Sequence, residues 1–84
     1  MAKKLSLYHY VGCGFCARVW HAAQSLGVEL EGRNIHRDAE AREALIAARG
    51  RQTVPVLKIE HDDGREEWLP ESRDIIAYLQ AQYG

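Results

Sequence analysis

The chain has 84 residues, of which 46% are hydrophobic and 27% charged, with a formal net charge of -1. This is the composition of an ordinary globular protein, and it argues against a disordered chain. Lysine and arginine are not clustered, and no apolar run approaches the roughly 18 residues of a membrane-spanning helix, so we expect one monomeric domain over residues 1–84 that binds neither nucleic acid nor membranes.

The first part of the chain predicts a strand, a helix and a second strand. Residues 5–10 alternate with a period of two, which is typical of a strand. Residues 13–26 carry apolar side chains at helical spacing, and Gly27 is a suitable helix stop. Residues 28–35 are predicted to form the second strand. The apolar positions of the helix are Phe15, Val19, Ala22, Ala23 and Leu26.

A second helix is predicted over residues 39–49. Asp38 is a good N-cap for it, because its carboxylate can accept a hydrogen bond from the first turn. Gly50 is expected to end the helix. The side chains that we expect on its buried face are Ala41, Ala44, Leu45 and Ala48.

The last third of the chain predicts a hairpin followed by a helix. Residues 54–59 form a β-branched, apolar run, and Asp63-Gly64 is a strong hairpin-turn signal. Residues 65–69 would then form a strand antiparallel to the preceding one. Ser72 can cap a final helix. The apolar face of that helix is formed by Ile75, Ile76 and Leu79.

The predicted order of elements is β-α-β-α-β-β-α. Because helical crossovers join the first three strands, we expect those strands to pair in parallel. The hairpin adds an antiparallel edge. The result is an α/β domain with a four-stranded mixed sheet flanked by three helices, an arrangement that resembles the thioredoxin-like fold.

The two cysteines, Cys13 and Cys16, stand where the first strand is followed by the first helix. The thiolate is the reactive form of cysteine, and the unpaired N–H groups of a helix start would stabilise a thiolate at Cys13. At a spacing of three residues on a helix, Cys16 is close enough to form a disulfide with it. The pair is therefore interpreted as a redox site with Cys13 as nucleophile and Cys16 as resolving thiol.

Two other interpretations of the cysteines are less favoured. A zinc site needs four ligands, and the four histidines of the chain show no matching spacing. Inert buried cysteines would not need to stand at a helix start. Because no apolar signal-peptide core follows residues 1–5, a reducing cytoplasm is the expected location.

Two further motifs precede the third strand and the last helix. In Thr53-Val54-Pro55 the proline either begins an edge strand or follows a cis bond that exposes the Val54 backbone to a peptide-like substrate. The residues alone leave these readings open. Glu71-Ser72 precedes the last helix, whose first N–H groups can bind a carboxylate as well as be capped by Ser72.

Together these motifs resemble the glutaredoxin family. The resemblance rests on Cys13-Gly14-Phe15-Cys16 after the first strand, Thr53-Val54-Pro55 before the third, and an acidic turn at residues 71–74. It implies a glutathione-dependent thiol–disulfide oxidoreductase whose partners are glutathionylated or disulfide-containing proteins, with glutathione as co-substrate.

The same resemblance implies a glutathione site. Cys13 would form the mixed disulfide, and the Val54 backbone would pair with the cysteinyl part of glutathione. The other residues implied in binding are Arg51 at the glycine carboxylate, Thr53 and a cis Pro55 beside Val54, and Ser72 and Arg73 at the γ-glutamyl end.

The chain departs from the glutaredoxin pattern in two informative places. Gly14 replaces the usual proline between the cysteines. In this the chain resembles family members in which two chains share a [2Fe–2S] cluster, so the alternative function is a cluster carrier or sensor, with the cluster held by Cys13 and glutathione. Glu71-Ser72 replaces the usual glycines. It resembles the N-terminal domain of glutathione S-transferases, which implies that Glu71 contacts the glutathione amine.

Overall fold

The computed structural model describes residues 4–84. The element order is the predicted one, β-α-β-α-β-β-α. The elements are β1 (Lys4–His9), α1 (Gly14–Leu26), β2 (Glu31–Asn34), α2 (Ala39–Arg49), β3 (Val56–Glu60), β4 (Glu66–Pro70) and α3 (Ser72–Tyr83). The largest difference in bounds is at β2, which is four residues long rather than eight.

The four strands form one mixed sheet in the order β2-β1-β3-β4. β1 and β2 are parallel, and β3 and β4 form the predicted antiparallel hairpin. The expectation that the first three strands all pair in parallel is wrong, because β3 runs antiparallel to β1, with Tyr8 opposite Val56 and Lys4 opposite Glu60.

The direction of β3 has a simple cause in the path of the chain. The parallel expectation assumed that each helix returns the chain to the opposite end of the sheet. α2 does not, because β3 begins at Val56, beside the end of β1, where β2 also ends. The segment between α2 and β3 therefore lies at the same end of the sheet as the start of α1.

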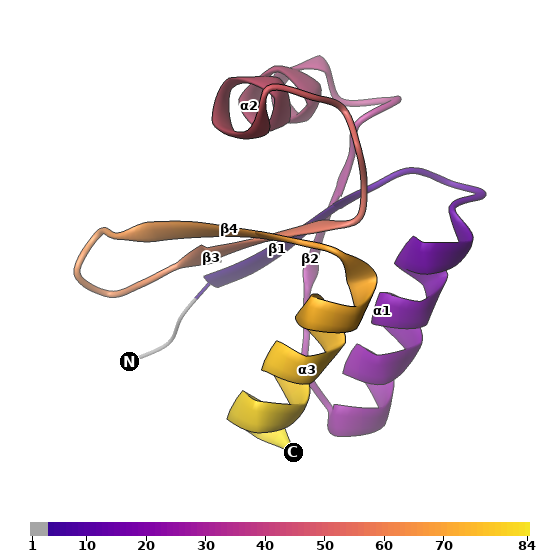
Figure 1. Ribbon diagram of the computed structural model, residues 1–84, viewed down its shortest axis with the longest axis vertical. Coiled ribbons are helices and arrows are strands. Elements are labelled where there is room, and N and C mark those ends of the chain that lie inside the picture. Colours follow the sequence, from indigo (N-terminus) through magenta and orange to yellow (C-terminus); the bar gives the residue numbers. More distant parts are fainter. Residues whose placement is uncertain (1–3) are drawn as a thin grey trace.

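The helices cover both faces of the sheet, with α1 and α3 side by side on one face and α2 on the other (Figure 1). Alternate residues of β1 point to the two faces. Leu5 and Leu7 join the larger core beneath α1 and α3, whereas Tyr8 joins the smaller core beneath α2. The fully buried residues of the larger core include Leu7, Val19, Leu57, Ile75 and Leu79.

Glycine and aspartate define the helix ends as predicted. Gly27 and Gly50 both adopt left-handed backbone angles, with φ of 70° and 75°, and end α1 and α2. Asp38 caps α2 by accepting a hydrogen bond from the Ala41 N–H at 3.2 Å. The prediction for Ser72 is wrong, since it is the first residue of α3 and Glu71 occupies the N-cap position without a side-chain cap bond.

Two apolar side chains on the predicted helix faces are exposed. Phe15 is 59% exposed, and Ala48 lies on the outer side of α2, so neither belongs to the core. Phe15 lies in the first turn of α1 and lines a cleft instead. Trp20 and Trp68 are half-buried and pack against the two cores.

Candidate functional site

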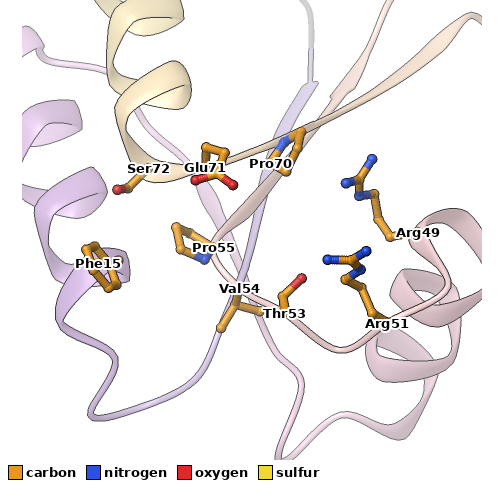
Figure 2. A pocket seen from close by; sticks show the side chains of 9 residues that line it. All are labelled: Phe15, Arg49, Arg51, Thr53, Val54, Pro55, Pro70, Glu71 and Ser72. Carbon is orange, nitrogen blue, oxygen red and sulfur yellow. The ribbon is translucent and has the colours of Figure 1, made fainter.

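A cleft of about 260 Å³ opens at the end of the sheet where β1 ends and β3 begins. Three segments form it: the first turn of α1, the segment from the end of α2 to β3, and the junction of β4 with α3 (Figure 2). The residues that line it are Phe15, Arg49, Arg51, Thr53, Val54, Pro55, Pro70, Glu71 and Ser72.

Charged groups of opposite sign face the cleft from opposite walls. Figure 2 shows Glu71 and Ser72 on the side of α1 and α3, and Arg49 and Arg51 on the side of α2, with Val54 between the walls. Such a cleft suits an elongated ligand with an ammonium group, or a group that hydrogen-bonds a hydroxyl, at the end near Glu71 and Ser72. At the other end, near the arginines, it suits a carboxylate.

The junction of β4 and α3 brings Glu71 to its position through an unusual backbone conformation. Glu71 has φ of 73° and is the only non-glycine residue with positive φ among residues 4–84. Its carbonyl accepts the first helical hydrogen bond, from the Ile75 N–H at 3.0 Å. The start of α3, with its unpaired N–H groups, therefore lies at the cleft beside Ser72.

The proline before β3 takes the cis form, which resolves the alternative that the sequence left open. The Val54–Pro55 bond is cis, and Pro55 is buried while Val54 is half-buried at the cleft. Thr53, one residue earlier, is exposed.

The cysteines differ sharply in their surroundings. Cys13 is the N-cap of α1, and its Sγ accepts a hydrogen bond from the Cys16 N–H at 3.3 Å. Both thiols are free, Cys13 partly exposed and Cys16 only 2% exposed. Burial, and then the hydrogen bond with Cys13, raises the pKa of Cys16 to about 12. Cys13 is therefore the thiol that a large disulfide substrate can reach.

A second cavity, of about 240 Å³, adjoins the cysteines. Both Cys13 and Cys16 line it, but neither lines the cleft, although Phe15, which stands between them in the sequence, does. The other residues around this thiol cavity are His9, Tyr10, Val11, Gly12, Ala17 and Trp20.

The structure brings most of the expected site residues together. Those that line the cleft are Arg51, Thr53, Val54, Pro55, Glu71 and Ser72. Arg73 does not line it and instead faces a third cavity between α1 and α3, together with Arg18. Sequence reasoning missed Phe15, Arg49 and Pro70. Arg49 had a usable signal, because it and Arg51 flank the glycine that ends α2.

Residues 4–84 contain no group of three or more His, Cys, Asp or Glu side chains that could hold a metal ion. None of the helices in this part of the chain is both long and apolar enough to cross a membrane.

The sequence matches the family model described as the glutathione S-transferase N-terminal domain over residues 7–84. No curated protein matches the chain. The family match agrees with the resemblance seen at Glu71-Ser72. The other expected resemblance, to glutaredoxins, is not what this match shows.

Solved structures give the same result. A maleylacetoacetate isomerase from Anaeromyxobacter dehalogenans, with bound dicarboxyethyl glutathione and citrate, is 31% identical at a TM-score of 0.75, covering 98% of this chain and 38% of that one. A delta-class glutathione transferase from Nilaparvata lugens is 32% identical at a TM-score of 0.71, covering 95% and 36%.

One similar structure is of about the same length as this chain. The thioredoxin-like protein BC3987, as a variant, is 23% identical at a TM-score of 0.77, covering 96% of this chain and 97% of that one. At this identity the likeness concerns the fold alone. By contrast, the chain spans about 38% of the length of the isomerase. The chain thus has the thioredoxin-like fold and belongs to the glutathione S-transferase N-terminal domain family.

Proposed function

We propose that this protein binds glutathione in the cleft and catalyses glutathione-dependent thiol–disulfide exchange, with Cys13 as nucleophile and Cys16 as resolving thiol. The observation that carries the proposal is the cleft itself, where Glu71 and the start of α3 face Arg49 and Arg51. The first turn of α1, whose N-cap is Cys13, borders the same cleft. The substrates would be glutathionylated and disulfide-containing proteins in a reducing cytoplasm.

Glutathione matches the cleft in the order of its chemical groups. Its γ-glutamyl end carries an ammonium and a carboxylate, which suit Glu71 and the N–H groups at Ser72. Its glycine carboxylate suits Arg51, with Arg49 as a second cation on the same wall. The cysteinyl part between them would pair with the Val54 backbone, beside Thr53 and Pro55. Arg73, outside the cleft, would add positive charge near the γ-glutamyl carboxylate.

The exchange proceeds by successive attacks of a thiolate on a disulfide. The Cys13 thiolate attacks the sulfur of glutathione in a protein–glutathione disulfide, so the protein thiolate leaves and a Cys13–glutathione disulfide forms. A second glutathione thiolate then attacks that disulfide, releasing oxidised glutathione and restoring Cys13. On protein disulfides, Cys16 would instead attack the mixed disulfide at Cys13 and release the reduced protein.

The test is glutathione-dependent turnover of a small glutathione mixed disulfide by the wild type, Cys13→Ser and Cys16→Ser. We expect Cys13→Ser to lose activity and Cys16→Ser to retain it, because the second glutathione replaces Cys16 in this route. Full activity in Cys13→Ser, or no turnover by the wild type, would contradict the proposal.

A glutathione-dependent isomerase or transferase is the second candidate. It is favoured by the 31% identity to an isomerase that carries a glutathione derivative. In such chemistry the thiolate of bound glutathione can be the attacking group, so Cys13→Ser would keep activity on an electrophile. The same variant therefore separates the two candidates. The matches give no support to the [2Fe–2S] alternative.

A further inference from the structure

His9, at the end of β1, lines the cavity that adjoins the cysteine pair. It is the last residue of β1 and alternates with Leu5 and Leu7, which point into the core beneath α1 and α3. The His9 ring meets the Trp20 ring edge-on, with centroids 5.4 Å apart and an interplanar angle of 88°. Trp20 stands one helical turn after Cys16 on the same side of α1.

Gly32 of β2 leaves the space that the imidazole occupies. A Cβ atom built on Gly32 would lie 3.0 Å from His9 Nε2 and 3.4 Å from the Trp20 ring. A larger residue at this position would therefore push the imidazole or the indole from its place. The ring of His9 is held between α1 and β2, and it lines the thiol cavity with Cys13 and Cys16.

The proposed reaction leaves one chemical step without a group to perform it. Cys16 must lose its proton before it can attack a mixed disulfide on Cys13, since the thiolate is the nucleophile. Its burial opposes this loss and raises its pKa to about 12. A base near the thiol would remove the proton as the attack occurs.

We propose that His9 is the general base that accepts the Cys16 proton during the resolving step, directly or through one water in the thiol cavity. This inference rests on the proposed thiol–disulfide exchange. It assigns to His9 a role that the cleft residues, which bind glutathione, do not supply.

The surroundings of His9 suit a neutral base. Burial lowers its pKa, so the imidazole is unprotonated and able to accept a proton at neutral pH. The titratable groups that share its cavity are Cys13, Cys16 and Tyr10. The charged residues of β2 have partners elsewhere: Glu31 pairs with Lys4, and Arg33 with Asp38.

The step can be followed with the chromogenic aryl disulfide DTNB in stopped flow. The Cys13 thiolate breaks the S–S bond of DTNB, forms a mixed disulfide and releases one nitrothiobenzoate. Cys16 then gives its proton to His9 and attacks Cys13 Sγ, forming the Cys13–Cys16 disulfide and releasing the second nitrothiobenzoate. The two protein thiols are oxidised and one DTNB is reduced. The second phase is intramolecular and independent of DTNB concentration.

The variant is His9→Asn, with His9→Gln as a second replacement if the first does not fold. At neutral pH we expect the second phase to slow by about tenfold or more, within the range of general-base effects, with the first phase unchanged. The deficit should shrink as the pH rises, because solvent hydroxide then removes the proton. A merely structural role for His9 would not produce this pH dependence.

The matched control is His36→Asn. His36 stacks on Tyr10 at 4.5 Å between ring centroids but does not line the thiol cavity, so both phases should be unchanged. An unaltered second phase in the two folded His9 variants would overturn the inference, as would a deficit that is the same at every pH. Failure of the proposed function shows separately, as absent glutathione-dependent turnover in the wild type.

Discussion

Cys13 and Cys16 are three positions apart, yet the fold gives them opposite properties. Cys13 caps α1 and is partly exposed, whereas Cys16 is 2% exposed. The pattern of a strand followed by Cys-x-x-Cys was enough to predict where α1 starts. It could not predict the burial of Cys16, which depends on the side of α1 that packs against the sheet.

The buried thiol predicts a loss of stability at alkaline pH. The pKa of Cys16 rises from its ordinary value of 9.0 to about 12 in the folded protein. The folded state thus holds a proton that the unfolded chain gives up between these values, so this contribution is present below pH 9 and lost as the pH rises to 12. Urea unfolding of the wild type and Cys16→Ala at several pH values measures it.

We expect the difference in free energy of unfolding between the wild type and Cys16→Ala to shrink steadily over this pH range. The loss of packing in Cys16→Ala is independent of pH and cancels from the comparison. A difference that stays constant from pH 9 to pH 12 would show that burial does not raise the pKa of the Cys16 thiol in the folded protein.

At the scale of single elements, the helix ends were the most and the least predictable features. Asp38, Gly27 and Gly50 were predictable because each acts through local geometry that its residue type favours. The start of α3 was not, since Glu71 takes the N-cap position with φ of 73° and leaves Ser72 inside the helix. No local preference of glutamate favours that angle.

The cap of α2 predicts a measurable cost for its removal. Asp38 accepts the Ala41 N–H bond at 3.2 Å and pairs with Arg33 at 3.5 Å. Asp38→Ala should therefore lower the free energy of unfolding by about 1 kcal/mol. Urea denaturation measures the change. Glu43→Ala, on the exposed side of the same helix, is the control and should cost less than about 0.5 kcal/mol. Equal losses in both variants would contradict the capping role.

At the scale of the whole molecule, the number and order of elements along the chain were predictable from the sequence, but the direction of β3 in the sheet was not. The element order and the hairpin follow from local patterns. The antiparallel direction of β3 depends instead on the end of the sheet to which the chain returns after α2. That feature decides the site, because it brings residues 51–55 to the end of the sheet where Glu71 and the start of α1 lie. The motifs predicted the cleft-lining residues at 51, 53–55 and 71–72 but not Arg49, Phe15 and Pro70, which only the fold brings to the cleft.

We propose above that glutathione bound in the cleft reaches Cys13, and this can be tested directly. We would measure the rate at which Cys16→Ser reacts with oxidised glutathione and with hydroxyethyl disulfide, which lacks the carboxylates, and locate the adduct by mass spectrometry. The same comparison is made after Glu71→Gln, with Glu43→Gln as control.

We expect an adduct on Cys13 and a preference for oxidised glutathione of about tenfold or more, in keeping with hydrogen bonds to charged groups. Glu71→Gln should reduce that preference, and Glu43→Gln should leave it intact. Equal rates with the two disulfides, or a preference that Glu71→Gln does not change, would contradict the claim.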